Sequence, residues 1–295
     1  MSRSAPETRR RMAEGYQLVQ LKNGAWSVRA LAEGETFHPV VGPGAEAEAL
    51  YVRQLRQRER AAENPSDEWV IWDVGLGAAA NVLTVLRALR DLPRRIRVIS
   101  FDRSLEPLRF AVAHAAQLSY LEPHAADLAV LLQRRTVAFE DGPHSVLWEV
   151  IEGDFPGRLR EAAAETWPSP HAIMYDAFSI ARNPAMWTLP VLTRLRALAP
   201  ATRPCSLATY SRSTLLRVTL LCAGWFVGVG HATGEKDETT IAANSLNLIE
   251  EPLNRTWLDR ARRSTSAEPL TTPEYRQQPL SPESLHVLEQ HPQFA

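Results

Sequence analysis

The stretch EWVIWDVGLGAAANVLTVLRALRDL, residues 68–92, decides the fold. It begins with an apolar run that reaches Asp73, turns through Gly75 and Gly77, and continues as a helical pattern. The same order follows in IRVISFD, residues 96–102, and SLEPLRFAVAHAAQL, residues 104–118. Apolar strands that alternate with helices of this length predict an α/β protein whose mostly parallel sheet carries helices on both faces.

The rest of the chain extends this pattern. Further strands are predicted within residues 145–155, 171–178, 205–211, 225–232 and 238–246, with a helix at 215–223 and a helical insertion at 119–144. Upstream, alternating residues on either side of Asn23-Gly24 predict a β-hairpin over residues 16–31, and an alanine- and glutamate-rich helix is predicted from 45 to 62. We therefore expect an N-terminal hairpin and helix extension at 1–64, a main domain at 65–263, and a C-terminal tail at 264–295 with one short helix after Ser281-Pro282.

Composition limits the function. A net charge of −1 over 295 residues excludes a general polyanion-coating protein. The two cysteines, Cys205 and Cys222, lie in apolar segments without metal-type spacing, so they are interpreted as reduced core residues. No apolar run has the length of a signal peptide or a membrane helix, which predicts a cytoplasmic protein that binds no membrane. We also expect neither a metal nor DNA as a partner. The arginine groups at 9–11, 94–95 and 134–135 are interpreted first as solvated surface charges.

Four carboxylates follow predicted strands in order: Asp73, Asp102, Asp154 and Asp176. The carboxyl edge of an open α/β sheet is where ligands bind. The Gly75 and Gly77 pair lacks the third glycine of a dinucleotide motif, and a tight turn that needs small residues is the alternative interpretation. Asp102 follows Gly77 by about 25 residues, close to the spacing of about 20 at which an acid binds ribose hydroxyls.

The charge at this edge indicates which ligand fits. A carboxylate at Asp73 would repel phosphate, which disfavours a dehydrogenase, but it suits the ammonium and sulfonium of S-adenosylmethionine. On this hypothesis Asp73 holds the amino-acid end of the cofactor, Asp102 the ribose, and Asp154 the adenine amino group. Gly75, Gly77 and Asn81, at the turn and the start of its helix, are the further candidate cofactor residues.

The segment YDAFSIARNPAMW, residues 175–187, predicts the acceptor side of the site. Asp176 is the candidate catalytic acid beside the methyl group, although a carboxylate that accepts backbone amides in a turn is the alternative. Phe178 is expected to stack on a planar substrate. Asn183 is interpreted as a helix cap, and Met186 and Trp187 as helix packing residues.

Several segments resemble one known family. YDAFSIARNPAMWTLPVLTRLRALA, CSLATYSRSTLLRVTLLCAGW, GHATGEKDET, GETFHPVVGPGAEAEALYV and WDVGLGAAANVL are similar to the methyltransferase domain of bacterial MnmC-type enzymes, from about Tyr16 to about Ser264. The resemblance implies a class I S-adenosylmethionine-dependent (Rossmann-like) methyltransferase that methylates the aminomethyl group of wobble uridine (U34) in tRNA. It also implies a substrate-binding role for Lys236 at the rim of the site. We expect this chain to depart from the family as a stand-alone form without the flavin oxidase domain.

Two other functions remain open from the residues alone. One is a small-molecule methyltransferase with the same cofactor, and the other is a non-catalytic Rossmann-type binding module in which the acids are structural. A tRNA substrate needs cations for its phosphates, which we expect from the regions of residues 94, 134 and 182. The oligomeric state stays open.

Overall fold

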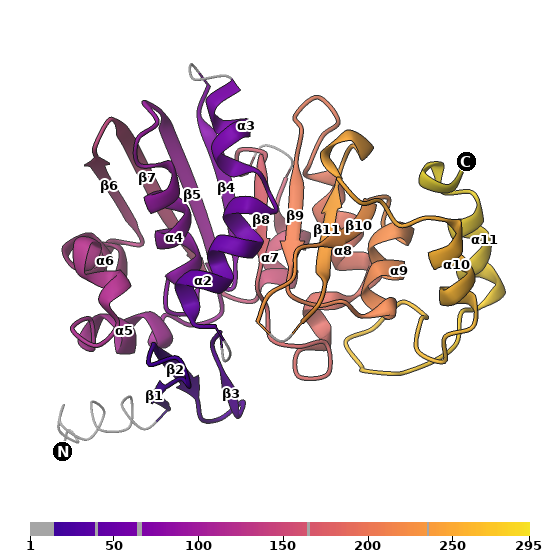
Figure 1. The fold of residues 1–295 in the computed structure, drawn as a ribbon, viewed down its shortest axis with the longest axis horizontal. Helices are drawn as coiled ribbons and strands as arrows, with labels where there is room; N and C mark the ends of the chain where they lie inside the picture. The colour runs from indigo at the N-terminus through magenta and orange to yellow at the C-terminus, as the bar shows by residue number, and fades with distance from the viewer. Residues whose placement is uncertain (1–14, 39–40, 64–66, 164–165, 235) are drawn as a thin grey trace.

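A single open sheet organises the molecule. The computed structural model describes residues 15–38, 41–63, 67–163, 166–234 and 236–295. Within these residues an eight-stranded sheet has the order β10-β11-β9-β8-β4-β5-β7-β6 (Figure 1). Its parallel members are β4 (Trp69–Val74), β5 (Arg95–Asp102), β7 (His144–Glu152), β8 (Ala172–Tyr175) and β9 (Ser206–Thr209). Antiparallel pairs attach β6 (Thr136–Asp141), β11 (Thr239–Ala243) and β10 (Phe226–Gly230), so the predicted α/β class is confirmed.

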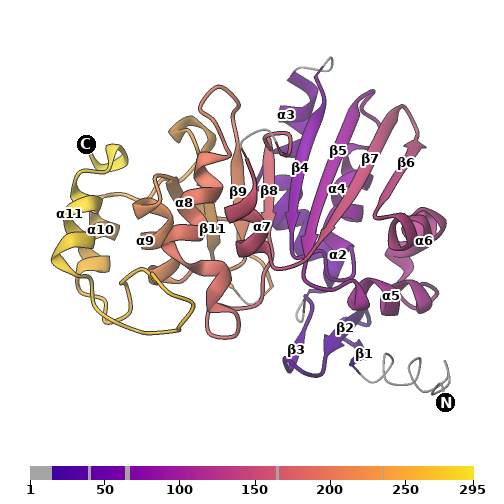
Figure 2. The ribbon, with the colours of Figure 1, turned by 180° about the vertical axis from the view of Figure 1, so that it is seen from behind.

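Helices cover both faces of this sheet. The helices α4 (Ala80–Leu89), α5 (Glu106–Ala113) and α6 (Ala125–Arg134) belong to the side facing the viewer in Figure 1. The helices α7 (Phe155–Glu161) and α8 (Leu189–Ala197) lie on the opposite side, seen in Figure 2, and α9 (Thr214–Cys222) packs on α8. Strand β4 is buried throughout: Ile71 belongs to one hydrophobic core, whereas Val70 and Trp72 belong to the other. Because side chains alternate along a strand, an uninterrupted apolar run is what such a central strand requires.

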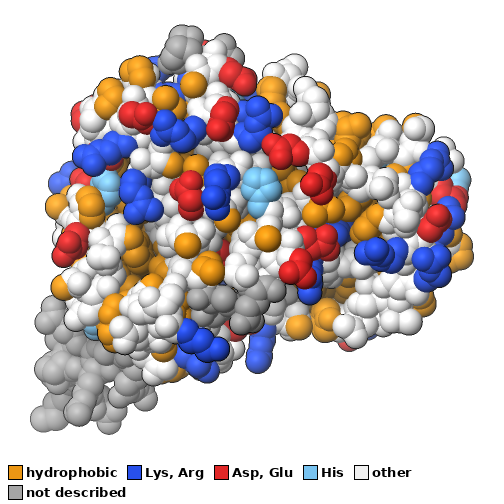
Figure 3. Space-filling view, in the orientation of Figure 1, with side chains coloured by type: hydrophobic (Ala, Val, Ile, Leu, Met, Phe, Trp, Pro, Cys, Tyr) orange, Lys and Arg blue, Asp and Glu red, His pale blue; other side chains and the backbone are white. Residues whose placement is uncertain are grey.

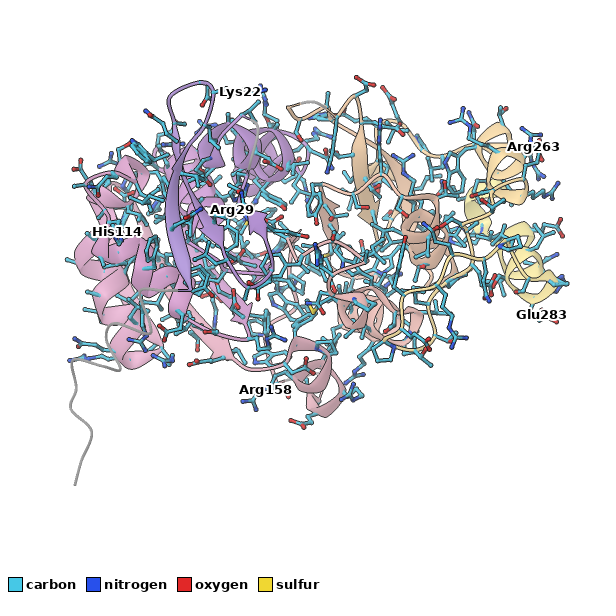
Figure 4. The ribbon with its side chains drawn as sticks, turned by 90° about the horizontal axis from the view of Figure 1, so that it is seen from below. Lys22, Arg29, His114, Arg158, Arg263 and Glu283 are labelled. Carbon is cyan, nitrogen blue, oxygen red and sulfur yellow. The ribbon has the colours of Figure 1, made fainter. Side chains whose placement is uncertain are left out.

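A second sheet, of three strands, lies near the carboxyl ends of the strands of the large sheet. It consists of β1 (Tyr16–Gln20), β2 (Trp26–Ala30) and β3 (Glu35–Thr36), and β1 pairs with β2 through the predicted Asn23-Gly24 turn. The hairpin prediction is therefore confirmed, with Gly24 at a φ of 85°. Figure 1 shows this sheet below α2, and Figure 4, from below, shows the hairpin that carries Lys22 and Arg29 on the near side of the molecule.

The helix predicted from 45 to 62 is not continuous. It is divided into α2 (Pro43–Ala47), a π-helical segment η1 (Glu48–Arg53) and α3 (Gln57–Glu63). The amide of Gln54 bonds to the carbonyl of Ala49, five residues back, and Arg56 has a left-handed φ of 47°. No glycine or proline marks this break, so the sequence carried no signal for it. Both α2 and α3 pack on α4, which makes the predicted extension part of the main helical layer.

The insertion predicted to be helical contains a missed strand. After η2 (Ser119–His124) and α6, strand β6 pairs antiparallel with β7. Asp141 pairs with His144, so the turn between the strands is Gly142-Pro143, and Gly142 has a φ of 68°. Glycine at the first central position is a signal of a two-residue hairpin turn, so this edge strand was predictable.

The segment predicted as a tail is packed onto the domain. After α10 (Arg255–Arg262), the side chains of Ala267, Leu270, Leu288 and Phe294 are buried in the core that contains α8 and α9. The predicted short helix is α11 (Pro282–Glu289), and the Ser281 hydroxyl caps it by accepting a bond from the Ser284 amide. Apolar residues spaced through a polar segment therefore fix it to the domain, where its composition suggested a loose tail.

The end of this segment also completes the sheet. The Gln293 side chain accepts a bond from the amide of Val227 and donates to the carbonyl of the same residue, both at 2.7 Å. It thereby satisfies backbone groups along the outer strand β10.

Candidate active site

A cavity of about 680 Å³ opens at the carboxyl edge of the sheet. Its wall includes the β3 region, the glycine loop after β4, and the segments that follow β5, β7, β8 and β9. Its volume is within the range of small-molecule and cofactor sites. The structure brings together eight of the nine predicted site residues there: Gly75, Gly77, Asn81, Asp102, Asp154, Asp176, Phe178 and Lys236. The ninth, Asp73, is not in the wall.

The glycine loop needs small residues for two reasons. Gly75 has a φ of 101°, and a Cβ at that position would lie 2.5 Å from the backbone oxygen of Asp176. Gly77 has a φ of 52°, and a Cβ there would lie 3.4 Å from the ring of Phe37. The loop is therefore a tight turn that needs glycine, which agrees with the alternative interpretation. In addition, Gly75 packs against the backbone of Asp176, on the acceptor side of the cavity.

Asp102 and Asp154 lie at the ends of neighbouring strands as predicted. Asp102 accepts bonds from the amides of Gly77, at 2.9 Å, and Ser104, at 3.2 Å. Burial raises the pKa of Asp102, and these amides oppose the shift. A carboxylate has about four acceptor positions, so capacity remains for ribose hydroxyls. Asp154 caps α7 through the Gly157 amide at 2.9 Å, and it lines the cavity.

Asp73 does not have the position that we expected. It lies inside β4, opposite Ser100 on β5, and its side chain is fully buried. Its Oδ2 accepts a bond from the Ser100 hydroxyl at 2.7 Å, and Oδ1 has no partner within the described part of the chain. Burial raises the pKa of Asp73 to about 8, so the group is largely neutral at pH 7. The structure thus places three of the four carboxylates on the cavity wall and the fourth beneath it.

Asp176 is held by a side chain from another element. Its side chain is 18% exposed, and its Oδ2 accepts a bond of 2.8 Å from Nδ2 of Asn81. Burial raises the pKa of Asp176 and the charge of Glu46 adds to this shift, while the charge of His38 and the hydrogen bond from Asn81 oppose it. Asn81, predicted to bind the cofactor, therefore also orients Asp176. The other polar atom of Asn81, Oδ1, is buried without a partner among the described residues, which suits a donor group of a bound molecule.

Aromatic residues from two distant segments flank Asp176. The rings of Phe37 and Phe178 are 6.1 Å apart, and both line the cavity. Trp187 is fully buried, and its indole N–H donates to the carbonyl of Phe178 at 2.9 Å, so it packs the helix as predicted and also anchors Phe178. Met186 is buried and reaches the wall. Asn183 precedes the 3-10 helix η3 (Pro184–Trp187), but its side chain makes no capping bond and instead lines the cavity.

Lys236 lies on the cavity wall, in agreement with a role at the rim. Its Nζ donates to the carbonyl of Tyr210 at 3.2 Å and is 4.1 Å from the centre of the Tyr210 ring. Burial lowers the pKa of Lys236, although Glu46 and Asp176 oppose the shift.

Sequence reasoning missed the contribution of the N-terminal segment to the site. Glu33, Glu35, Phe37, His38 and Glu46 all line the cavity. The segment ETFHPVVGPGAEAEAL contains most of them, but no spacing within it indicates that a β3 turn closes over the carboxyl edge of a sheet formed 30 or more residues later. Carboxylates outnumber cations in the described wall, where the lysine and arginine residues are Arg103 and Lys236.

The predicted phosphate-binding regions differ from one another. Arg94 is buried, at 5% exposure, so its interpretation as solvated surface charge is wrong and it is unsuited to contact a phosphate. Arg134 is exposed on α6. Arg182 is exposed beside the cavity, with its Nε 4.0 Å from Glu35. Arginine residues 9–11 lie outside the described residues. On the face shown in Figure 3, basic and acidic side chains are mixed.

Metal-binding clusters, membrane-spanning helices and disulfides are absent from the described ranges. There, no cluster of three or more His, Cys, Asp or Glu side chains is arranged to hold a metal ion. The helices of this part of the chain are too short or too polar to span a bilayer. Cys205 is buried and Cys222 half-buried, and both are free thiols.

Comparison with known proteins agrees with this geometry. Residues 128–245 match the family of S-adenosyl-L-methionine-dependent methyltransferases. The chain is 30% identical over 234 residues to the tRNA 5-methylaminomethyl-2-thiouridine biosynthesis bifunctional protein MnmC of Methylibium petroleiphilum, covering 76% of this chain and 34% of that protein. It is 29% identical over 210 residues to MnmC of Azoarcus sp., covering 70% of this chain and 32% of that one. The chain thus spans about one third of the length of these relatives.

A solved structure shows the same fold. MnmC2 from Aquifex aeolicus superposes with a TM-score of 0.68 at 22% identity, over 97% of this chain and 90% of that one. Together, the sheet order, the site at its carboxyl edge and the family match define an S-adenosylmethionine-dependent methyltransferase. More closely, the chain carries an MnmC-like methyltransferase domain, as the sequence resemblance implied.

The described residues fit S-adenosylmethionine. The left-handed glycines allow close backbone approach, Asp102 retains acceptor capacity, and Asn81, whose Oδ1 has no partner among the described residues, lines a cavity rich in carboxylates. Asp102, Asp154 and the glycine loop would hold the cofactor, which when bound supplies an electrophilic methyl group on a sulfonium.

Proposed function

We propose that this enzyme N-methylates the aminomethyl group of wobble uridine in tRNA. The observation that carries the proposal is the arrangement around Asp176: a carboxylate inside the cavity, fixed by Asn81, beside Phe178 and adjoining the glycine loop. The relatives named for the biosynthesis of 5-methylaminomethyl-2-thiouridine support the choice of acceptor.

The charge of the site supports an amine acceptor. Glu46, Asp102, Asp154 and Asp176 all line the cavity, and an excess of carboxylates favours cationic groups such as a sulfonium and an ammonium. It disfavours a phosphate inside the cavity. On this account the tRNA backbone is bound outside it, and only the modified base enters.

Asp176 has a defined task in this reaction. An alkylamine with a pKa near 10 is mostly protonated at pH 7 and must lose a proton before it can attack. Asp176 accepts a hydrogen bond from the acceptor nitrogen, orients its lone pair toward the methyl group, and passes the proton toward water. Transfer is an in-line displacement, so alignment of the two partners supplies most of the rate.

Phe178 has the second role. A wobble base must leave its stack to enter this cavity, and an aromatic face stabilises a base that has done so. The indole N–H of Trp187 donates to the backbone carbonyl of Phe178 and so fixes the backbone that carries the Phe178 ring. The centroid of the Phe37 ring is 6.1 Å from that of Phe178.

The direct test uses tRNA from a strain that lacks this protein. Purified enzyme is incubated with that tRNA and methyl-labelled S-adenosylmethionine, and the product nucleoside is identified by mass. We expect one added methyl on the aminomethyl uridine with wild-type enzyme, and at least a hundredfold lower rate with Asp176→Ala at unchanged cofactor affinity. A wild-type rate in Asp176→Ala, or a methyl group on another nucleoside, contradicts the proposal.

One rival function is favoured by the same acidic wall: methylation of a small free amine. Salt dependence distinguishes tRNA methylation from methylation of a small amine, because the affinity for a polyanion falls steeply as the salt concentration rises, whereas the affinity for a small amine does not. An enzyme that methylates small amines in preference to tRNA, with a KM that scarcely changes with salt, supports the rival.

A further inference from the structure

A histidine that no sequence motif identified lies next to the candidate catalytic carboxylate. His38 follows β3, and its side chain is 10% exposed. Its Nε2 is 3.9 Å from Oδ2 of Asp176, and its Nδ1 is 3.5 Å from Oε2 of Glu46 on α2. All three side chains line the cavity. His38 also has a φ of 50°, which is uncommon for a residue other than glycine and is often found at functional sites.

The position of His38 joins three separate elements. Glu46 comes from α2, Asp176 follows β8, and His38 comes from the connection after β3. The imidazole therefore lies between two carboxylates whose side chains are only 14% and 18% exposed. Two carboxylates that share a poorly solvated site cannot both stay ionised easily, and one of them tends to take up a proton.

A positive charge on His38, between Glu46 and Asp176, favours the ionised form of Asp176. Burial by itself lowers the pKa of His38, but the hydrogen bond to Glu46 and the charges of Asp176 and Glu46 outweigh it, so the pKa is raised. The charge of His38 in turn opposes the rise in the pKa of Asp176 caused by burial. The other titratable groups that interact with Glu46 or Asp176 are Tyr51, Asp73, Tyr210 and Lys236.

We propose that His38, held by Glu46, is a positioning residue that keeps Asp176 ionised at the acceptor side of the cavity. The proposal rests on the proposed N-methylation, since it assigns the residue that prepares Asp176 for that reaction. With His38 charged, the Glu46–His38–Asp176 group carries one net negative charge, and Asp176 accepts a proton from the acceptor ammonium. That proton then leaves to water, and the neutral amine forms a bond to the methyl carbon as the carbon–sulfur bond of the sulfonium breaks, with S-adenosylhomocysteine as the leaving group.

The N-terminal sheet therefore contributes more than a wall to the cavity. It supplies the cation that complements Asp176, while Asn81 from α4 supplies the hydrogen bond that orients the same carboxylate. His38 precedes the glycine loop in the sequence and Asn81 follows it, and both side chains contact Oδ2 of Asp176.

The first test is the pH dependence of methyl transfer in His38→Gln, with His286→Gln on the surface of α11 as the matched control. Without the cation the pKa of Asp176 rises, so the acid limb of kcat should move to higher pH by about one unit, with rates approaching wild type at high pH. Cofactor affinity and melting temperature should stay close to those of the control. A pH profile of His38→Gln that superimposes on wild type, or a loss of kcat that is equal at every pH, overturns the proposal.

The second test needs no substrate, so it separates this proposal from the proposed function. Histidine titration followed by NMR should give His38 a raised pKa, and Asp176→Asn and Glu46→Gln should each lower it. If these shifts occur but tRNA is not methylated, the proposed substrate is wrong and the cluster stands. If His38 titrates alike in all three proteins, the cluster does not exist in solution.

Discussion

Substitution of Gly75 tests how closely the glycine loop is coupled to Asp176. In Gly75→Ala the new Cβ would lie 2.5 Å from the backbone oxygen of Asp176 and 2.9 Å from its backbone carbon. Real Cβ contacts are about 3.4 Å or longer, so the loops after β4 and β8 must separate by most of an ångström. The φ of 101° adds its own strain, because alanine rarely adopts it.

The size of the effect follows from these two terms. The backbone conformation costs about 1–3 kcal/mol, and forcing an extra methyl into packed surroundings costs about 1–3 kcal/mol more. We therefore expect Gly75→Ala to lower the free energy of unfolding by about 2–6 kcal/mol. A displacement of Asp176 of about 1 Å also reduces kcat by about a hundredfold.

Gly24 supplies the matched control. It has a φ of 85°, and a Cβ there would meet nothing within 4 Å. Gly24→Ala should therefore show the backbone strain alone, with unchanged kcat. Both variants are compared with wild type by thermal melting, denaturant unfolding and steady-state methyl transfer. If Gly75→Ala loses no more stability than Gly24→Ala and retains its kcat, the close approach of the two loops is refuted.

Three further predictions follow from single side chains. The raised pKa of Asp73, about 8, means that the folded protein binds more protons than the unfolded chain between about pH 4 and pH 8, so stability falls as pH rises through this window. Asp73→Asn should flatten that fall in melting temperatures measured without cofactor, and an unchanged slope would show that Asp73 ionises normally. Asp102→Asn should weaken cofactor binding by at least tenfold in calorimetry, because an amide presents fewer acceptors to ribose hydroxyls than a carboxylate; equal affinity would remove Asp102 from the cofactor site. Arg182→Ala should raise the KM for tRNA and reduce by about one the slope of log affinity against log salt concentration. Arg276→Ala, at an exposed position, should change neither quantity. Identical slopes for the two variants would place the phosphates elsewhere.

Local patterns predicted the sheet and its ligand edge well. The run from Trp69 to Gly77 defined the central strand and the glycine loop, and Asp102, Asp154 and Asp176 reached the cavity because strand ends in a parallel sheet share one edge. Asp73 could not be placed in this way. It lies one residue before the end of β4, where both it and Val74 are buried, and the cavity wall begins only at Gly75.

Contacts between distant segments were beyond the reach of these patterns. His38 and Glu46 reach Asp176 only because the β1–β3 sheet folds over the carboxyl edge, and no local periodicity encodes that docking. The packing of Gln293 on β10 is a similar case, since a polar side chain in a polar segment gives no sign that it will satisfy a strand. Strand β6 differs, because the glycine of its Gly142-Pro143 turn was visible in the sequence.

The central claim is that the cavity at the carboxyl edge holds the methyl donor with its reactive end directed at Asp176. A crystal structure with S-adenosylhomocysteine tests it most directly. The account predicts ribose hydroxyls at Asp102, the adenine beside Asp154, and the sulfur facing the space between Asp176 and Phe178. Electron density for the nucleoside outside this cavity, or a sulfur directed away from Asp176, would contradict it.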